Sequence, residues 1–133
     1  MRALTATIGL ALSGMPAMTA TSTSAHPVQP PPEVACYLNA VNAHDLGRLS
    51  GCFAKDATVV DVSRHIRGRT AIAAWARAEV ISGRIELLSV STSPDGVQHC
   101  LVHWAPAGES GWRARYTFTL RDGHIVLADL QYA

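Results

Sequence analysis

The chain has 133 residues, of which 48% are hydrophobic, and its formal net charge is +1. This length is enough for one hydrophobic core and too short for two ordinary domains, so we expect a single domain. Basic residues do not gather into a stretch dense enough to hold a phosphate backbone, which argues against nucleic acid as a partner.

Residues 1–25 have the composition of a secretory signal peptide. Arg2 precedes an apolar stretch, no further charged residue appears before Glu33, and small residues at 23–25 form a suitable cleavage site. The apolar stretch is shorter than the roughly 20 apolar residues of a membrane-spanning helix, so we expect no transmembrane segment in the mature chain. The prediction is a secreted or exported protein, and the alternative is a cytoplasmic protein with a disordered leader. The expected organisation is a signal peptide over 1–25, a Pro-rich linker over 26–32 and a domain over 33–133.

Three cysteines stand far apart in the sequence, at Cys36, Cys52 and Cys100. None belongs to a CxxC pair and the spacing does not suit a zinc cluster, so we predict no metal site. If two helices turn at residues 44–45, Cys36 and Cys52 would lie at similar heights on antiparallel helices. Two interpretations stay open: a Cys36–Cys52 disulfide formed in an oxidising compartment, or three small buried side chains.

The first half of the chain predicts mostly helix. Pro32 suits a first helical turn, Asp45 is a good N-cap, and Thr70 caps a third helix after the break at Gly68. Trp75 lies on the apolar face of that third helix. The three helices are expected over residues 32–44, 46–53 and 71–81.

One strand is expected between the second and third helices. Lys55 and Asp56 predict a turn, and an alternating pattern over 57–63 follows it. The alternation puts Val59 and Asp61 on the same face of this strand. Asp61 is therefore a carboxylate directed toward the interior.

The second half predicts a meander of antiparallel strands separated by the turn signals PDG, PAGESG and RDG. In the third of these strands Tyr116 and Phe118 belong to an apolar stripe, whereas Arg113 and Arg115 lie on the opposite face. Helices first and antiparallel strands after them indicate an α+β domain in which a curved sheet wraps the helices. The four strands are expected over residues 85–93, 97–105, 112–120 and 124–132.

These segments carry a family resemblance. YLNAVNAHDLGRLSGCFAKDATVVDV, followed by RGRTAIAAW and FTLRDGHIVLADL, resembles the SnoaL-like branch of the nuclear transport factor 2 superfamily. The resemblance covers about residues 33–133. It implies a cone-shaped α+β barrel in which three N-terminal helices pack in a curved, mainly antiparallel sheet. It also implies an apolar pocket at the open end and a homodimer through the outer sheet face, but not one reaction, since the fold hosts many functions.

Within this superfamily, a comparison with ketosteroid isomerase implies roles for individual residues. Tyr37 falls where that enzyme has its oxyanion-hole tyrosine, and Asp61 falls where it has its general base. The third position, a protonated Asp in the isomerase, would fall near Tyr116, which offers a phenol instead. This departure puts 3-ketosteroids in doubt as the substrate.

The residues support the same chemistry without the resemblance. A carboxylate on an inner strand face is partly desolvated, which suits a base that acts on a carbon acid. A phenol at Tyr37 or Tyr116 would donate a hydrogen bond to the enolate oxygen. The alternatives remain open, because Asp61 can instead pair with Arg64 or Arg67 and both tyrosines can be packed core residues.

Two histidines and a second aspartate are further candidates for the site. His99 and His103 share a strand face, but at about 13 Å between their backbones they are too far apart to share a metal ion. They are expected to be solvated or interfacial, or one of them an acid or proton shuttle if its face is the pocket face. Asp129, assigned to the same face as Ile125, is a candidate second acid. The side chains expected to contact a ligand are Val59, Trp75, His103, Phe118 and Asp129.

Two functions of different classes follow. The first is a cofactor-free isomerase or cyclase that acts on a hydrophobic carbonyl compound, such as a polyketide, a terpenoid or a steroid-like molecule. It would use Asp61 as the base, with Tyr37 and Tyr116 as donors. The second is an exported binding protein that holds a hydrophobic small molecule in the same cavity and makes or breaks no bond.

Overall fold

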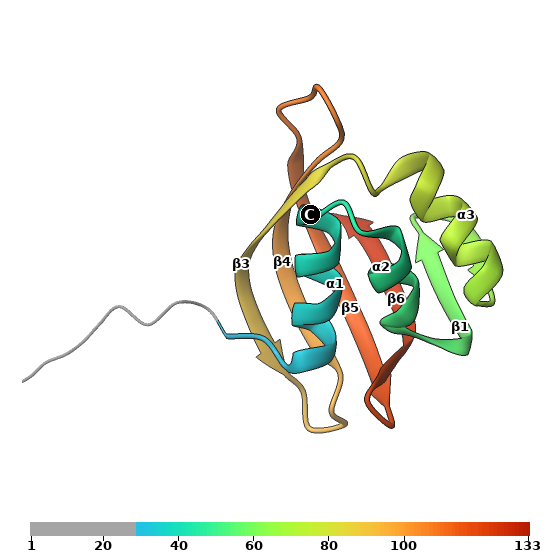
Figure 1. Ribbon diagram of the computed structural model, residues 1–133. Helices are drawn as coiled ribbons and strands as arrows, with labels where there is room; N and C mark the ends of the chain where they lie inside the picture. Colours follow the sequence, from blue (N-terminus) through green and yellow to red (C-terminus); the bar gives the residue numbers. More distant parts are fainter. Residues whose placement is uncertain (1–28) are drawn as a thin grey trace, which may run out of the picture.

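The computed structural model describes residues 29–133, which form three helices and a six-stranded sheet (Figure 1). The predicted signal peptide over 1–25 and the first residues of the predicted linker lie outside these residues. The helices are α1 (Pro32–Asn42), α2 (Leu46–Gly51) and α3 (Arg69–Glu79). The strands are β1 (Phe53–Asp61), β2 (Arg64–Arg67), β3 (Arg84–Thr92), β4 (Gln98–Ala105), β5 (Trp112–Arg121) and β6 (His124–Tyr132).

The strands form one curved, unclosed sheet in the order β2-β1-β6-β5-β4-β3. All neighbouring strands are antiparallel except β1 and β6, which run parallel. Helices α1 and α2 lie over one face of the sheet and α3 lies beside β1 (Figure 1). The predicted α+β class, with helices packed against a curved and mainly antiparallel sheet, is confirmed.

The ends of the helices follow from local chemistry, with one exception to the prediction. Pro32 opens α1, and the Asp45 carboxylate caps α2 by accepting a hydrogen bond from the Arg48 backbone N–H at 3.0 Å. The predicted cap of α3 at Thr70 is wrong, because the N-cap is Gly68 with φ +88°. This left-handed conformation is one that glycine adopts without steric cost.

The prediction of a turn at Lys55 and Asp56 is also wrong. Both residues lie inside β1, which begins at Phe53, and the pairing of β1 with β6 is irregular between Phe53 and Thr58. The polar residues in this irregular stretch have the composition of a turn, although the backbone stays extended. Strand β2 was not predicted, because its sequence RHIR is short and charged, as befits an edge strand.

A bulge near the start of β6 changes which side chains face inward. In the pairing of β5 with β6, Thr119 lies opposite Leu127 and Leu120 lies opposite Ile125, so β6 has one extra residue here. Ile125 is buried before the bulge, and the buried positions after it are Ala128 and Leu130. The prediction that Asp129 and Ile125 share a face is therefore wrong. Asp129 lies on the outer face of the sheet.

The core lies between the helices and the concave face of the sheet. Its largest fully buried side chains include Tyr37, Phe53, Phe118 and Leu49. Asn42, at the end of α1, binds the backbone of edge strand β3 twice at 2.8 Å: its amide donates to the Ile85 carbonyl and its carbonyl accepts from the Ile85 N–H. These bonds fix the α1 C-terminus against the sheet.

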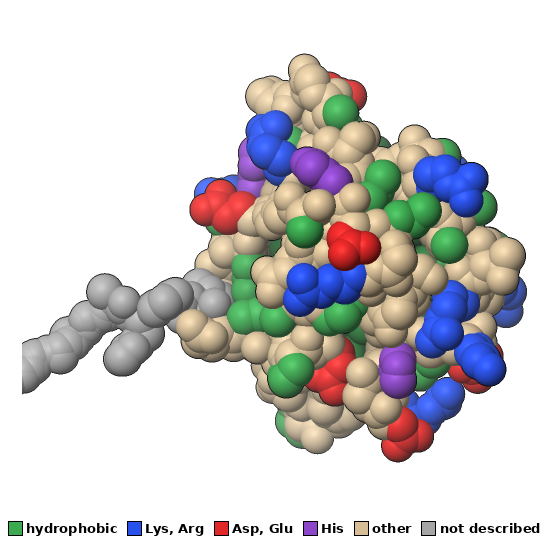
Figure 2. Space-filling view, in the orientation of Figure 1, with side chains coloured by type: hydrophobic (Ala, Val, Ile, Leu, Met, Phe, Trp, Pro, Cys, Tyr) green, Lys and Arg blue, Asp and Glu red, His purple; other side chains and the backbone are tan. Residues whose placement is uncertain are grey.

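A disulfide joins Cys36 in α1 to Cys52 at the end of α2, with 5.9 Å between their Cα atoms. Cys100 is a free, buried thiol. Of the two interpretations of the cysteines, the structure thus contains the disulfide. On the face that carries α1 and α2, acidic and basic side chains are interspersed with apolar ones (Figure 2). None of the helices within residues 29–133 has the length and apolar character needed to cross a membrane.

Candidate functional site

A cavity of about 610 Å³ opens where the C-terminal ends of β1 and β6 meet the last turns of α3. Tyr116 and Leu130 belong to the inner face of the sheet in this cavity, Trp75 comes from α3, and Asp61 lies at the end of β1. The volume falls in the range of pockets that hold small organic ligands. Asp61, which the strand alternation places on the inner face, thus lies at this cavity.

Aromatic side chains dominate the lining. All three tryptophans of the chain line this cavity, and so do two of its three tyrosines. The large apolar side chains that residues 29–133 expose are Val62, Trp112 and Tyr132, and each of them also lines it. The rings of Trp112 and Tyr132 lie 5.9 Å apart. The mouth of the cavity is therefore the place where this part of the chain presents apolar surface to solvent.

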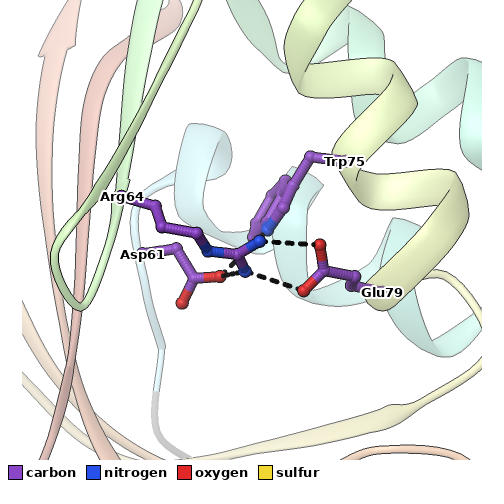
Figure 3. Close-up of polar contacts among 4 residues, drawn as sticks. All are labelled: Asp61, Arg64, Trp75 and Glu79. Carbon is purple, nitrogen blue, oxygen red and sulfur yellow. Dashed lines mark hydrogen bonds and ion pairs between the residues drawn. The ribbon is translucent and has the colours of Figure 1, made fainter.

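The Asp61 carboxylate belongs to a polar cluster at the edge of the cavity (Figure 3). Arg64, at the start of β2, forms an ion pair with Asp61 Oδ2 and also binds Glu79 of α3 through two hydrogen bonds of 2.7 and 3.0 Å. The Trp75 indole N–H donates to the same Asp61 Oδ2 at 3.1 Å. The predicted alternative in which Asp61 pairs with an arginine is therefore present, with Arg64 as the partner.

The two oxygens of Asp61 have different surroundings. Oδ2 accepts both the Arg64 and the Trp75 hydrogen bonds, whereas no donor within residues 29–133 binds Oδ1. The side chain is 24% exposed, so the carboxylate is neither fully buried nor fully open to solvent. The cluster thus holds the carboxylate by one oxygen and leaves the other to accept a hydrogen bond or a proton.

Two buried phenols lie close to this carboxylate. The rings of Tyr37 and Tyr116 are 6.2 Å apart, and Tyr116 lines the cavity while Tyr37 packs behind it against Phe53 and Phe118. Burial raises the pKa of the Tyr37 phenol well above its usual range, and the charges of Tyr116 and Asp61 raise it further. Burial, and after it the Asp61 charge, also raises the pKa of Tyr116. Both phenols therefore stay protonated near neutral pH, and each can donate a hydrogen bond as a neutral group.

Neither phenol donates to another group within residues 29–133. Buried tyrosine hydroxyls normally have a hydrogen-bond partner, so these two mark a place for a water molecule or a ligand oxygen. The structure therefore brings Tyr37 and Tyr116 to the region of Asp61, whose Oδ2 accepts hydrogen bonds from Trp75 and Arg64.

The other predicted ligand contacts lie elsewhere. Val59 and Phe118 are fully buried in the core and do not line the cavity. His103 lies on the outer face of the sheet opposite Arg113, and Asp129 on the same face accepts a hydrogen bond from the Gln131 amide at 2.7 Å. The face of His99 and His103 is thus not the cavity face. Within residues 29–133 no group of three potential metal ligands comes together.

The SnoaL-like domain family matches residues 34–128. The chain belongs to the SnoaL-like family. No curated protein matches the sequence of this SnoaL-like protein.

Solved structures with the same fold include enzymes and ligand-binding proteins. A candidate polyketide cyclase from Sinorhizobium meliloti is 28% identical, with a TM-score of 0.67 over 76% of this chain and 94% of that one. The Δ5-3-ketosteroid isomerase of Mycobacterium sp. is 15% identical, with a TM-score of 0.63 over 76% and 90% of the two chains. A Mycobacterium tuberculosis protein in complex with estradiol-17beta-hemisuccinate is 14% identical, with a TM-score of 0.67 over 76% and 91%. The last two likenesses show the fold.

Several site residues of the SnoaL-like domain were not predicted. Glu79 joins the cluster only because α3 packs beside the β1–β2 turn, and no local pattern reports that contact. Trp112 and Tyr132 lie near the ends of strands that pair in the sheet, so their meeting depends on the register. One signal was available, since Trp112 belongs to the same predicted apolar stripe as Tyr116.

Val62 is a strained residue at the mouth of the cavity. Its φ is 60°, a left-handed conformation that costs a β-branched side chain about 1–2 kcal/mol, and Asn tolerates this conformation much better. We expect Val62→Asn to raise the free energy of unfolding by about 1 kcal/mol, measured by urea denaturation. Val60→Asn, two residues earlier and inside β1, where the backbone is not left-handed, should not stabilise the protein. Equal effects of the two substitutions would contradict the assignment of strain.

The polar cluster predicts a pH dependence of stability. Hydrogen bonds from Arg64 lower the pKa of Glu79 from its usual 4.5. A carboxylate with a lowered folded-state pKa stabilises the protein fully above its unfolded-state pKa, and loses this effect as the pH falls through the folded-state value. Glu79→Gln should therefore be slightly less stable than wild type at pH 6, and this difference should become smaller as the pH falls below 4.5. Because both partners are about half exposed, the difference should be small and shrink in 1 M NaCl. Urea titrations at pH 6 and pH 3 measure it, and a difference that is as large at pH 3 as at pH 6 would contradict the prediction.

Proposed function

We propose that this protein is a cofactor-free acid–base enzyme, an isomerase or cyclase that acts on a hydrophobic carbonyl compound. The observation that carries the proposal is the asymmetry of Asp61, whose Oδ2 is held by Arg64 and Trp75 while Oδ1 has no donor. A held carboxylate with one free oxygen, beside a protonated phenol in an apolar cavity, is the arrangement that enolisation needs. The resemblance to a Mycobacterium isomerase and a Sinorhizobium meliloti candidate cyclase agrees with it.

In the proposed reaction the substrate carbonyl lies against the Tyr116 phenol. Asp61 Oδ1 removes a proton from the carbon next to the carbonyl, the C–H electron pair forms the enolate double bond, and the carbonyl oxygen takes the negative charge. The Tyr116 hydroxyl donates a hydrogen bond to that oxygen, with Tyr37 behind it in the core. Asp61 then returns the proton to carbon, which restores its carboxylate. Return to a conjugated carbon moves the double bond. When the proton on Oδ1 exchanges with solvent deuterium before a hydrogen returns to the same carbon, the result is exchange of the α-hydrogen.

The test is proton exchange in a simple apolar ketone. In D2O, 1-tetralone should exchange its α-hydrogens faster with the protein than with an equal concentration of serum albumin, and the rate should saturate with ketone. Proton NMR measures the loss of the α-signal. Saturable binding of the ketone without faster exchange would overturn the catalytic role and leave a binding protein.

A non-catalytic binding protein is the second candidate, and the Arg64–Asp61 ion pair favours it. An ion pair is a common structural role for a carboxylate at the end of a strand, and it accounts for Asp61 without any reaction. In this case the aromatic cavity would hold the same class of apolar molecule without exchange, as the Mycobacterium tuberculosis protein holds estradiol-17beta-hemisuccinate. The exchange measurement distinguishes the two candidates directly.

We further propose that the protein is exported. The composition of residues 1–25 supports this, and so does the Cys36–Cys52 disulfide, because disulfides persist mainly in oxidising compartments. Expression in a bacterial host with intact-mass measurement of the periplasmic fraction tests the proposal. The expected mass is that of a chain that begins at residue 26, with the disulfide formed and one free thiol. Full-length protein confined to the cytoplasm would contradict export.

A further inference from the structure

The charged groups that line the cavity do not balance. Among the described lining residues, Asp61 and Glu79 carry two negative charges and Arg64 carries one positive charge. Arg64 binds both Glu79 oxygens and one Asp61 oxygen, so the negative charge that remains is concentrated near Asp61 Oδ1. The apolar walls screen this charge less than water would, so it creates a negative potential inside the cavity and at its mouth.

The same region offers aromatic faces for a cation. Trp112 is 37% exposed and Tyr132 is 63% exposed, and their rings lie 5.9 Å apart at the mouth. Aromatic rings attract ammonium groups through their π faces, and several rings combined with a carboxylate form the usual site for a quaternary or alkylated ammonium. The two exposed aromatic side chains and the unbalanced negative charge therefore belong to the same cavity.

The interior of the cavity favours the opposite kind of group. Tyr116 is nearly buried and its neutral phenol is a donor, so it suits a carbonyl oxygen. From the interior to the mouth, the cavity thus changes from a hydrogen-bond donor to a carboxylate and then to an acidic, aromatic rim. This order would orient an elongated ligand.

We infer that the ligand is an apolar carbonyl compound that also carries a positively charged nitrogen, with its oxygen at Tyr116 and its ammonium group at the Trp112–Tyr132 rim. The inference rests on the proposed function for the carbonyl end. The ammonium end rests on the charge and aromatic groups of the rim. A neutral hydrocarbon skeleton would satisfy the aromatic walls and leave the negative charge without a partner.

Two isosteric ketones test this inference: 6-trimethylammonio-1-tetralone, which is a permanent cation, and 6-tert-butyl-1-tetralone, which has the same shape without charge. Calorimetric titration of the full mature protein should give a Kd about tenfold lower for the cation. Asp61→Asn should remove most of this preference. Arg64→Gln should increase it, because it removes the competing cation and leaves both carboxylates. Asp56→Asn, five residues before Asp61 in β1 and not among the residues that line the cavity, should leave this preference unchanged.

Trp112→Leu provides a second variant that keeps an apolar side chain on an exposed position, and it should lower the preference for the cation by about threefold. Equal affinity for the two ketones, or a preference that Arg64→Gln does not increase, would overturn the inference. The α-exchange of the neutral ketone is followed in the same samples. Exchange without a preference for the cation would retain the proposed enzyme and refute its charged substrate. A preference for the cation without exchange would support the ligand class and refute the enzyme.

Discussion

Asp61→Asn is expected to slow the exchange of 1-tetralone α-hydrogens by about 10³-fold. Asn has nearly the same shape, and its amide oxygen can still accept the hydrogen bonds that Arg64 and Trp75 donate to Oδ2. It cannot take a proton from carbon. The loss should therefore appear in kcat, while the affinity for the ketone stays within about twofold of wild type.

Asp56→Asn is the matched control for this substitution. Asp56 lies in the same strand, is exposed and pairs with Arg121 at 3.3 Å, and neither residue lines the cavity. The Asp56→Asn variant should exchange the α-hydrogens of the ketone at the wild-type rate. Tyr116→Phe should fall between the two, with a loss of about 10²-fold, because it removes one donor to the enolate and no proton acceptor. An Asp61→Asn variant that keeps the wild-type rate would remove Asp61 from the mechanism.

Removing the Cys36–Cys52 disulfide is expected to lower the free energy of unfolding by about 3 kcal/mol. The bond closes a loop between residues 16 apart and ties α1 to the end of α2, immediately before β1 begins. Opening it restores conformational freedom to the unfolded chain. Urea denaturation of the double variant Cys36→Ala/Cys52→Ala measures the change, and wild type in a reducing agent should behave like this variant.

Cys100→Ala is the control for the loss of a cysteine without the loss of a bond. The thiol is buried, and removing its sulfur should lower the free energy of unfolding by about 1 kcal/mol. This difference from wild type should be the same with and without the reducing agent. Burial raises the pKa of Cys100 to about 11, so it should resist alkylation in the folded protein and react in denaturant. A wild-type stability that does not respond to reductant would contradict the disulfide.

Strand β6 shows how far alternation alone can predict this fold. Its bounds, His124–Tyr132, match the prediction, because RDG marks a turn and an apolar run follows it. The facing of its side chains was wrong at Asp129, because a bulge adds one residue before Ala128 and reverses the parity. The alternation of residue types along the sequence indicates a strand, but it does not reveal a bulge, because a bulge depends on how the strand pairs with its neighbour.

The candidate site divides in the same way. Asp61 was predicted from strand parity, and its pairing with Arg64 was one of two open alternatives. The β1–β2 hairpin decides between them, because its register sets Asp61 opposite Arg64 and places Arg67 opposite Thr58, three residues earlier in β1. The sequence RHIR carries no apolar alternation that would reveal this hairpin. The third partner, Glu79, depends on the packing of α3, which only the assembled domain determines.

The single free oxygen of Asp61 has a stereochemical consequence. With Oδ2 held by two donors, the carboxylate cannot rotate to present its other oxygen without breaking both bonds. In the proposed reaction one oxygen would therefore remove the proton and return it, from one side of a substrate lying against Tyr116. The transferred hydrogen would stay on one face of the molecule, and a prochiral substrate would give one enantiomer.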